Sequence, residues 1–527
     1  MQKKKPTTSG TLLRDRLSYL WLALGILLFA FATVKWTIPL AAWLVPIFLL
    51  RFVRTQPLLH GILLVLLANV LVLTIELQGF FPLPGALNYL APFGLGIGFG
   101  VIYILPYLID RLITPRLGGM PGTLVFPLAM TTVSYLSALV NPFGTFGNPA
   151  YTQYGNLPLM QLVSVTGLWG IVFVMSWLAS LVNWAWEQGF AWSKVRSGLL
   201  LYSGLLALVL MGGGARLAFF APQGATVRVA GITASRARPL PPRSFDDEAQ
   251  AVVFFNGKAT EAQRQAIRPL FAQIDNDLLT RSRSEARAGA KVVVWPELGA
   301  LVLQEDETAF LQQARSVARE SGIYLDMGLA VILRPSEKPP FAQDAAVIID
   351  PNGNIVATYL KTRIIPVMET SWQVPGDGRL PVVATPYGRL ATAICYDADF
   401  PSTILQAGQA NVDILLRPTG DWREIDPLHA QMVTFRAIEN GFSVVDQAKE
   451  GLSMAVDYEG HVLAASDYFT TDHQVMVAYV PMQGVHTIYT TIGDLFAWLS
   501  IAGLVVLIGF AIARRPKVRE AGVAEPR

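Results

Sequence analysis

Cysteine is almost missing from this sequence: Cys395 is the single one among 527 residues. One cysteine excludes an intramolecular disulfide and any metal site built from several cysteines. Histidine is also rare, and the five histidines do not have the spacing of metal ligands: His60, His429, His461, His473 and His486. We interpret His429, within an expected helix, as a packing or hydrogen-bonding residue. We therefore expect no metal and no cofactor.

Charged residues are scarce too, at 15% of the chain, whereas 52% of the residues are hydrophobic. This composition excludes a wholly soluble protein. The apolar residues fill roughly the first 220 positions and a short stretch near the C-terminus, and nearly all acidic residues lie between them. We predict a membrane domain with a soluble insert. The net charge of +3 is small, and no phosphate loop or basic stripe is present, so we expect no nucleic-acid partner.

Long apolar runs predict about eight transmembrane (TM) helices, seven in a membrane domain at residues 17–220 and one after the soluble insert. The runs are residues 17–34, 37–50, 58–77, 89–109, 120–140, 159–184, 199–220 and 487–513. The second run is short, so a re-entrant segment is the alternative there. The fourth run contains alternating glycines from Gly94 to Gly100. No soluble strand precedes these glycines, so we expect close helix packing through small residues rather than a nucleotide loop.

The distribution of positive charge predicts the orientation. Loops 78–88 and 141–158 contain no Lys or Arg. Positive residues gather instead in the alternate connections: residues 1–16, 51–54, 111–116, 194–196 and 514–527. The positive-inside rule then places both termini in the cytoplasm, and the soluble insert at residues 225–481 on the extracytoplasmic side.

The insert alternates β-rich runs with amphipathic helices. We expect helices at 261–288, 307–320 and 428–440; strands at 226–232, 291–296, 323–333, 412–417, 442–446 and 474–481; and hairpins turned at 351–354 and 457–460. This pattern predicts an α/β domain with helical layers around mixed sheets. Proline-rich residues 236–247 are expected to form a long loop that acts as a flap.

Three expected strands end on groups with complementary chemistry. Trp295-Pro296-Glu297 ends on a carboxylate, Tyr359-Leu360-Lys361 on an amine, and the apolar run 390–394 on the Cys395 thiol. Because few thiols are ionised near neutral pH, a nucleophilic cysteine needs a base or a cation nearby. Glu297 is the candidate base, provided that desolvation raises its pKa, and Lys361 is the candidate oxyanion donor. The alternatives are a core cysteine and a surface ion pair between Glu297 and Lys361.

In this order, the three motifs resemble the signatures of the nitrilase, or carbon–nitrogen hydrolase, superfamily. Its members use a Glu-Lys-Cys triad on a four-layer αββα sandwich. The resemblance continues through residues 428–432 and 436–439. A domain of this kind placed before a last membrane helix is similar to the membrane branch of the superfamily, the apolipoprotein N-acyltransferases. Thr152-Gln153 and residues 166–170 also resemble that branch.

The resemblance implies roles for individual residues. Glu297 would be the general base, Lys361 the oxyanion stabiliser and Cys395 the nucleophile. Glu369, eight positions beyond Lys361, matches a second glutamate of the family that would orient the lysine, and Tyr396 matches the family tyrosine after the cysteine.

Three positions depart from the family pattern. Asp397 replaces a glutamate, residues 231–233 replace a Gln-Gly-Asn run, and Gly420 replaces an asparagine. These departures weaken the inference to the usual substrate and leave the triad intact. We keep Asp397 as a supporting site residue.

The implied reaction is acyl transfer in the bacterial plasma (inner) membrane. A phospholipid would donate an acyl chain to Cys395 as a thioester, and the α-amino group of a lipoprotein's N-terminal diacylglyceryl-cysteine would accept it. Phospholipid, apolipoprotein and bilayer are thus the expected partners. One alternative is a membrane-anchored nitrilase-like amidase that hydrolyses a C–N bond of a small amide with water. Another is a transporter or assembly scaffold with an inactive domain, in which Cys395→Ala would change nothing.

Overall fold

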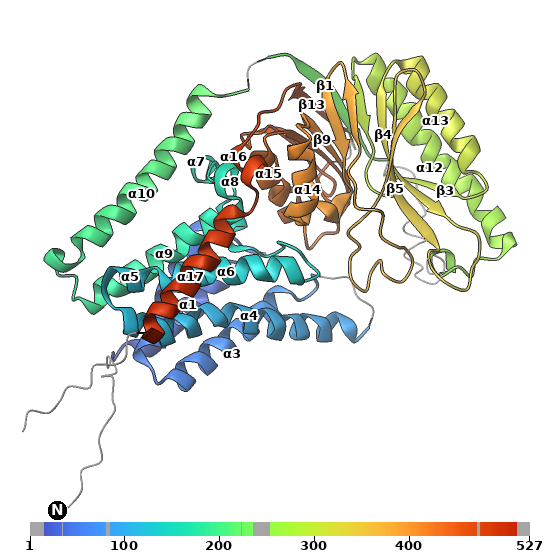
Figure 1. Cartoon of the computed structure of the whole chain (residues 1–527). Coiled ribbons are helices and arrows are strands. Elements are labelled where there is room, and N and C mark those ends of the chain that lie inside the picture. Colours follow the sequence, from blue (N-terminus) through green and yellow to red (C-terminus); the bar gives the residue numbers. More distant parts are fainter. Residues whose placement is uncertain are drawn as a thin grey trace, which may run out of the picture.

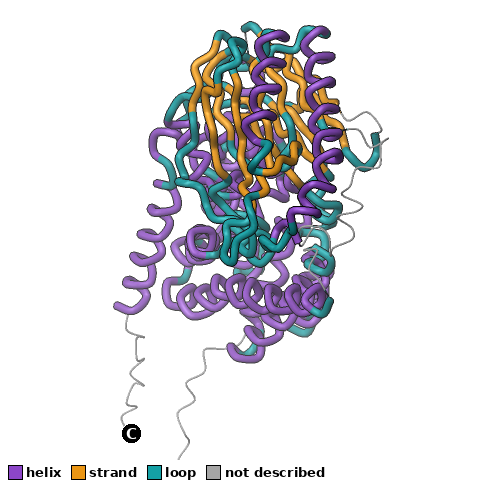
Figure 2. Tube along the Cα trace, turned by 90° about the vertical axis from the view of Figure 1, so that its right-hand side faces the viewer, coloured by secondary structure: helices purple, strands orange, loops and turns teal. Residues whose placement is uncertain are grey.

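The computed structural model describes residues 15–33, 35–80, 85–222, 224–234, 253–471 and 475–513. The expected flap at 236–247 and most of both charged chain ends lie outside these residues. The described chain has two parts, with apolar helices on one side and two β-sheets on the other (Figure 1). Figure 2 shows the same division from a second direction.

The helical part consists largely of long apolar helices. Its main elements are α1 (Ser18–Phe29), α2 (Pro39–Thr55), α3 (Leu58–Glu76), α4 (Leu87–Leu117), α5 (Gly119–Thr123), α6 (Val125–Val140), α9 (Leu168–Glu187), α10 (Trp192–Phe219) and α17 (Leu495–Ala513). Among the described residues, six helical segments are long and apolar enough to cross a membrane: α3, α4, α5 with α6, α9, α10 and α17. The protein is therefore a membrane protein, and α1 and α2 correspond to the two remaining predicted runs.

Helix α2 differs from the predicted second run, which stops at residue 50. The helix continues to Thr55 and includes two arginines that we had expected in a connection. Both are buried, and both are paired: Arg51 lies 3.0 Å from Asp15, and Arg54 lies 2.7 Å from Asp110 of α4. Ion pairs to partners remote in the sequence therefore allow the helix to extend past its apolar run.

The alternating glycines of α4 pack as expected, but only every second one does so. A Cβ on Gly96 would lie 2.5 Å from the Thr74 hydroxyl, and one on Gly100 would lie 2.8 Å from Val70. Both contacts are to α3. A Cβ on Gly94 or Gly98 would meet nothing within 4 Å. Because residues four apart share a helix face, Gly96 and Gly100 form the contact surface.

The soluble part contains two sheets of mixed direction. In the first sheet the strand order is β13-β1-β2-β4-β5-β6, with β3 also paired to β4; in the second it is β12-β11-β10-β9-β8-β7. The first comprises β1 (Thr226–Ile232), β2 (Val292–Val294), β3 (Ala300–Leu303), β4 (Tyr324–Ile332), β5 (Ala342–Ile349), β6 (Ile355–Leu360) and β13 (Val475–Pro481). The second comprises β7 (Val382–Thr385), β8 (Gly388–Thr392), β9 (Ile414–Gly420), β10 (Ser443–Lys449), β11 (Leu452–Val456) and β12 (Val462–Asp467).

The two sheets pack face to face between helical layers. Apolar side chains of the first sheet, such as Val292 and Ile348, meet Leu416 and Val445 of the second. Helices α12 (Glu261–Arg287) and α13 (Glu307–Ser321) cover the first sheet, and α14 (Pro401–Gln409) and α15 (Leu428–Asn440) cover the second. This is the expected αββα sandwich, joined to a polytopic helical domain.

Helix α15 also joins the sandwich to the membrane part. Its Phe435 ring packs edge-on against Tyr151, with ring centroids 5.1 Å apart. The Arg436 guanidinium donates a hydrogen bond to the Tyr151 hydroxyl at 3.1 Å. Four short helices line this junction: η1 (Pro149–Gln153), α7 (Leu157–Met160), α8 (Val163–Thr166) and α16 (Ile488–Ile492). One face of α15 thus supports the sheet that carries Cys395, while another contacts the membrane helices.

Candidate active site

The three predicted strand ends converge where the two sheets meet. Glu297 follows β2, Lys361 follows β6 of the same sheet, and Cys395 follows β8 of the other sheet. Lys361 Nζ donates to Glu297 Oε1 at 2.6 Å. The Cys395 thiol donates to the Gly420 carbonyl at 3.6 Å and lies beside the Glu297 carboxylate, whose pKa it helps to lower. All three side chains are buried, so the Glu297–Lys361 pair is not a surface ion pair.

Lys361 is surrounded by further carboxyl groups. Its Nζ donates to Glu369 Oε1 at 2.5 Å, and Asp344 Oδ2 of β5 lies 3.8 Å away. The other Glu369 oxygen accepts a hydrogen bond from the Ile365 backbone N–H at 2.7 Å. The amine is therefore held between two carboxylates by direct hydrogen bonds, with a third carboxyl group just beyond hydrogen-bonding distance.

Cys395 begins a tight 3₁₀ turn, η3 (Cys395–Asp399), with a backbone φ of 44°. A non-glycine residue in this left-handed region costs on the order of 1–3 kcal/mol. The surrounding hydrogen bonds hold it there, since Arg417 Nε donates to the Cys395 carbonyl at 2.9 Å and the Ile394 N–H donates to Asp397 at 3.1 Å. The turn lifts the thiol from the strand end toward Glu297.

Asp397 connects the loop after Lys361 to the turn of Cys395. One of its oxygens accepts from the Arg363 backbone N–H at 2.7 Å, and the other accepts from the Tyr359 hydroxyl at 2.9 Å. Burial raises the pKa of Asp397 to about 6, although these donors and the Lys361 charge oppose the shift. Asp397 therefore fixes two site segments relative to each other and does not contact the thiol through its side chain.

Tyr396 faces the membrane part. Its hydroxyl donates to the Pro142 carbonyl at 2.7 Å, and its ring packs edge-on against Phe400 with centroids 5.4 Å apart. Pro142 belongs to the loop after α6. Tyr396 thus connects the turn of Cys395 to that loop by a hydrogen bond. Its hydroxyl points to the loop carbonyl rather than to the triad.

The protonation states of the triad differ from the expectation in one respect. Burial raises the pKa of the Cys395 thiol well above its ordinary value, and the Glu297 charge adds to this. We expected burial to raise the pKa of Glu297 as well; burial acts in that direction, but Lys361 and nearby hydrogen bonds outweigh it and lower the pKa. The resting pair is consequently a thiol beside an ionised carboxylate that can accept its proton.

The neighbouring charges of Lys361 and Glu369 also set their protonation. Burial lowers the pKa of the Lys361 amine, but Glu297 and Glu369 raise it well above its ordinary value. Burial raises the pKa of Glu369, and the Lys361 charge opposes this only in part. Lys361 is therefore a permanent cation in the site, suited to stabilising an oxyanion.

Gly420, one of the departures from the family pattern, completes the contacts of Glu297. Its backbone N–H donates to Glu297 Oε2 at 2.7 Å. A Cβ at this position would lie 2.9 Å from the same oxygen, closer than normal contacts allow. Glycine therefore permits the close approach of the β9 end to the carboxylate.

A second buried polar network lies behind the cysteine. Arg417, which donates to the Cys395 carbonyl, is paired with Asp446 at 2.7 Å. His429 Nδ1 lies 2.6 Å from Asp421, and neighbouring carboxylates raise the His429 pKa to about 9 even though burial lowers it. His429 is thus a hydrogen-bonding residue, as expected.

Two groups of side chains in this region have the composition of metal sites, but both are already engaged. The oxygens of Glu297, Asp344 and Glu369 lie within 4.8 Å of one another, and the Lys361 amine binds two of these carboxylates. Cys395, Asp421 and His429 form the other group. The His429 ring nitrogens there contact Asp421, Asp399 and Arg417.

Sequence reasoning missed Asp344 and Arg417. Each is a lone charged residue within an apolar strand, in Ala342–Ile349 and Ile414–Gly420. That isolation was the available signal, because a charge at an inward position of a buried strand is costly without a partner.

An apolar cavity of about 30 Å³ lies directly in front of Cys395. The membrane part supplies Phe80, Phe143 and Phe146 to its wall, and the sandwich supplies Trp422 and Ile425. Trp422 Nε1 donates to the Phe80 carbonyl at 2.6 Å, and this hydrogen bond joins the sandwich to the membrane part. The thiol therefore faces the membrane helices.

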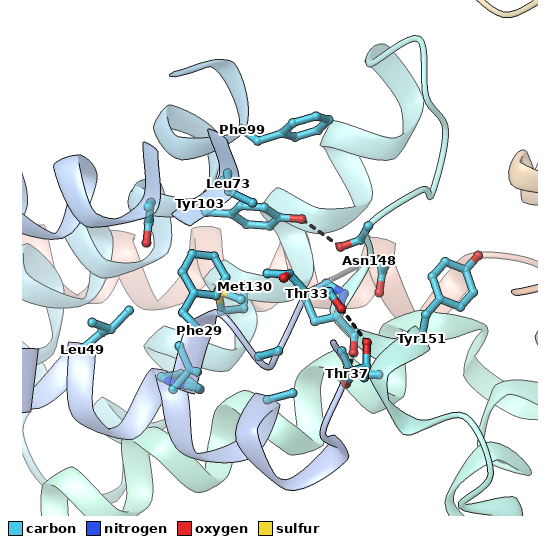
Figure 3. Close-up of a pocket in the computed structure, with 18 of the residues that line it drawn as sticks. Phe29, Thr33, Thr37, Leu49, Leu73, Phe99, Tyr103, Met130, Asn148 and Tyr151 are labelled. Atoms are coloured by element: carbon cyan, nitrogen blue, oxygen red, sulfur yellow. Dashed lines mark hydrogen bonds between the residues drawn. The ribbon is translucent and has the colours of Figure 1, made fainter. Parts of the chain in front are cut away.

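A larger cavity of about 130 Å³ lies among those helices (Figure 3). Leu49, Leu73, Met130 and Phe99 line it, together with Tyr103, whose hydroxyl donates to the Gly147 carbonyl. Phe146 borders both cavities. Apolar space in the helical part thus adjoins the space in front of the thiol.

The chain resembles several known proteins. Residues 271–489 match the family model of carbon–nitrogen hydrolases. The chain is 25% identical over 424 residues to the apolipoprotein N-acyltransferase of Geobacter metallireducens, covering 75% of each chain. It is 25% identical over 417 residues to apolipoprotein N-acyltransferase 2 of Treponema pallidum, covering 71% of each. An amidase from Nesterenkonia sp. aligns with a TM-score of 0.39 and 20% identity, covering 53% of this chain and 97% of the amidase.

Fold and site together define a membrane protein with a carbon–nitrogen hydrolase domain. Residues 271–489 match the carbon–nitrogen hydrolase family, and the similarity of the chain to apolipoprotein N-acyltransferases extends over both the helical part and the sandwich.

Proposed function

We propose that this protein is an apolipoprotein N-acyltransferase. It transfers an acyl chain from a phospholipid, through a thioester on Cys395, to the α-amino group of the N-terminal diacylglyceryl-cysteine of a lipoprotein. The observation that carries the proposal is the position of the buried thiol, which faces Glu297 and Lys361 on one side and an apolar cavity walled by the membrane part on the other.

The first half-reaction follows from the protonation states. Cys395 Sγ attacks the ester carbonyl carbon while Glu297 takes the thiol proton. Lys361 stabilises the oxyanion, and Glu369 holds the lysine in place. When the C–O bond breaks, Glu297 returns the proton to the leaving oxygen, and a lysophospholipid departs.

The second half-reaction regenerates the thiol. The amine of the acceptor attacks the thioester carbon, and Glu297 takes a proton from the attacking nitrogen. The C–S bond then breaks, the proton passes to sulfur, and the acyl chain remains on the acceptor as an amide. An apolar surrounding such as that formed by Phe80, Phe143 and Phe146 disfavours competing attack by water.

The acyl chain would occupy the cavity among the membrane helices. Its lining is mainly apolar, and Phe146 stands between this cavity and the thiol. Burial of each methylene group there favours binding by about 0.8 kcal/mol. In this proposal an acyl chain held among the membrane helices lies next to the space in front of the thiol, because Phe146 lines both cavities.

We place the protein in the bacterial inner membrane, and the charge pattern of the connections supports its orientation there. Loop 141–158 lacks Lys and Arg and contacts the sandwich, with the Thr145 N–H donating to the Asp399 carbonyl at 2.9 Å. In the proposed topology this loop and the sandwich are extracytoplasmic, and both termini are cytoplasmic.

The decisive experiment incubates the purified protein with a phospholipid labelled in its acyl chains. We expect the acyl mass on the peptide that contains Cys395, removable by hydroxylamine, and transfer of the label to a diacylglyceryl-cysteine peptide. Cys395→Ala should abolish both. A protein that forms no such adduct but hydrolyses small amides would be the amidase alternative, and the acyltransferase proposal would fail.

A further inference from the structure

Asp344 is a buried carboxyl group for which the mechanism above has no use. It lies on β5, its side chain is fully buried, and its Oδ2 is 3.8 Å from Lys361 Nζ. Among the described residues, no N–H or hydroxyl group donates to either of its oxygens. An ionised carboxylate in such a position would lack the partners that a buried charge requires.

The two neighbouring carboxylates each accept hydrogen bonds from two donors. Glu297 accepts from Lys361 and from the Gly420 N–H, and Glu369 accepts from Lys361 and from the Ile365 N–H. Oxygens of all three carboxyl groups lie within 4.8 Å of one another, around one amine. Three adjacent negative charges cannot be balanced by one positive charge, so a proton is most stable on the carboxyl group with the fewest donors. That group is Asp344.

A protonated Asp344 would have a hydrogen bond to donate, and Glu297 is the neighbouring acceptor, with oxygens of the two groups within 4.8 Å of each other. We propose that Asp344 is a neutral carboxylic acid that donates a hydrogen bond to Glu297, and so acts as a positioning residue for the base that takes the Cys395 proton. This inference rests on the proposed roles of Glu297 and Cys395. The direction of the Asp344 pKa, raised well above its ordinary value by burial and by the Glu297 charge, agrees with it.

The consequence for Glu297 is both geometric and electrostatic. Lys361, the Gly420 N–H and Asp344 would then approach its carboxylate as three donors, leaving the face toward the thiol free to accept the proton. Loss of a hydrogen bond to a charged group lowers the rate by about 10–100-fold when the bond is needed in the transition state.

Two substitutions separate this role from the alternatives. Asp344→Asn keeps the shape, is neutral and offers an N–H donor, so we expect the rate of Cys395 acylation to stay within about threefold of wild type. Asp344→Leu has a similar size and no donor, so we expect a fall of about 10–100-fold in kcat with little change in KM. Asp275→Asn is the matched control, because Asp275 is a buried acid of α12 that contacts the Leu301 N–H instead of the site.

The protonation itself is measured by infrared difference spectroscopy on the resting protein, without substrate. Subtracting the Asp344→Asn spectrum from wild type should isolate the carbonyl stretch of a protonated carboxylic acid, shifted in heavy water. An ionised-carboxylate band in its place would overturn the proposal even if Asp344→Leu does not fold. Equal loss of acylation in Asp344→Asn and Asp344→Leu would also overturn it. Absence of any acyl adduct in wild type would instead defeat the proposed function.

Discussion

Each of the two parts of this molecule contains a buried cation shared between carboxylates, and the two cations differ in how completely they are paired. In the membrane part, Arg54 makes two bonds to Asp110, at 2.7 and 2.8 Å, and a third contact to Glu187 at 3.1 Å. In the sandwich, Lys361 binds two carboxylates and leaves a third, Asp344, without a donor among the described residues. Both carboxylates around Arg54 are hydrogen-bonded to it, whereas one of the three carboxyl groups around Lys361 is not.

We interpret the Arg54 cluster as a structural ion pair and the Lys361 cluster as part of the active site. A guanidinium is always charged and bonds carboxylates in a fixed planar fork, which suits it to joining helices. The lysine cluster instead places an ionised carboxylate, Glu297, beside the Cys395 thiol, so that the carboxylate can accept the thiol proton. Substitutions in the lysine cluster should therefore alter chemistry, and substitutions in the arginine cluster should alter stability.

The largest effect is expected for Lys361→Met. Removing the amine leaves Glu297 and Glu369 without their cation and removes the oxyanion donor, so Cys395 acylation should fall by at least about 10³-fold. Breaking a buried pair on one side also destabilises a protein by about 3–5 kcal/mol. Single-turnover acylation from labelled phospholipid, with the melting temperature measured in parallel, checks both effects. Retention of a tenth of the wild-type rate would show that Lys361 does not stabilise the oxyanion.

The next largest effect is a change of pH dependence in Glu297→Gln. In wild type the pKa of Glu297 lies below its ordinary 4.5, so the base stays ionised and the acylation rate should be flat from about pH 5.5 to 8. The rate should fall only when the pH approaches the lowered pKa of Glu297, because the carboxylate then takes up a proton. The amide introduced by the substitution cannot accept the thiol proton, so we expect a loss of about 10²–10³-fold at pH 7.

The residual activity of that variant tests the assignment further. The thiol would have to ionise by itself, and its pKa is raised above the ordinary 9.0. The rate of Glu297→Gln should therefore increase about tenfold per pH unit through the alkaline range, whereas wild type should not. A variant profile parallel to that of wild type would assign the proton to another base.

The strand ends that carry this chemistry could be predicted from the sequence, and Glu369 beside Lys361 from the family resemblance, but Asp344 could not. The limits of β1 and α15 agree with the predicted 226–232 and 428–440, because each has a strong period and clear breakers. Asp344 was not predicted as a site residue because its position next to Lys361 depends on the register between β5 and β6. Counting back from the turn at 351–354 is off by one, since a β-bulge between Ile348 and Ile349 shifts the pairing and sets Ala345 opposite Leu360.

Other omissions have a similar cause. Strand β3 has four residues and α14 nine, too short for their periodicity to be distinguished from a loop. The buried arginines of α2 looked like a solvated connection because their partners are distant, with Asp110 lying 56 positions beyond Arg54. Local sequence predicts elements well, but pairing between remote charges depends on the tertiary fold.

A smaller effect on chemistry is expected for Gly420→Ala. The new Cβ would lie 2.9 Å from Glu297 Oε2, so the carboxylate must move by a few tenths of an ångström. Misplacement of a catalytic group by about 1 Å costs about 10²-fold, so we expect a loss of roughly three- to tenfold in acylation rate. Gly98→Ala in α4 is the matched control, because its Cβ would meet nothing within 4 Å. Equal rates in the two variants would mean that Glu297 tolerates displacement.

The smallest effect on chemistry, and a clear one on stability, is expected for Asp110→Asn. The substitution removes the charge opposite Arg54, whose side chain is 7% exposed, and leaves it with the partly exposed Glu187 alone. A buried charge deprived of its partner costs several kcal/mol, so the melting temperature in detergent should fall by several degrees. The acylation rate of the folded protein should stay within about twofold of wild type, because this cluster contacts none of the groups that move protons at Cys395. Glu187→Gln should lower the melting temperature less. Slower acylation in Asp110→Asn without a change in the melting temperature would show instead that the ion pair in the helices is coupled to the thiol. That result would contradict the assignment of a structural role to Arg54 and a chemical role to Lys361.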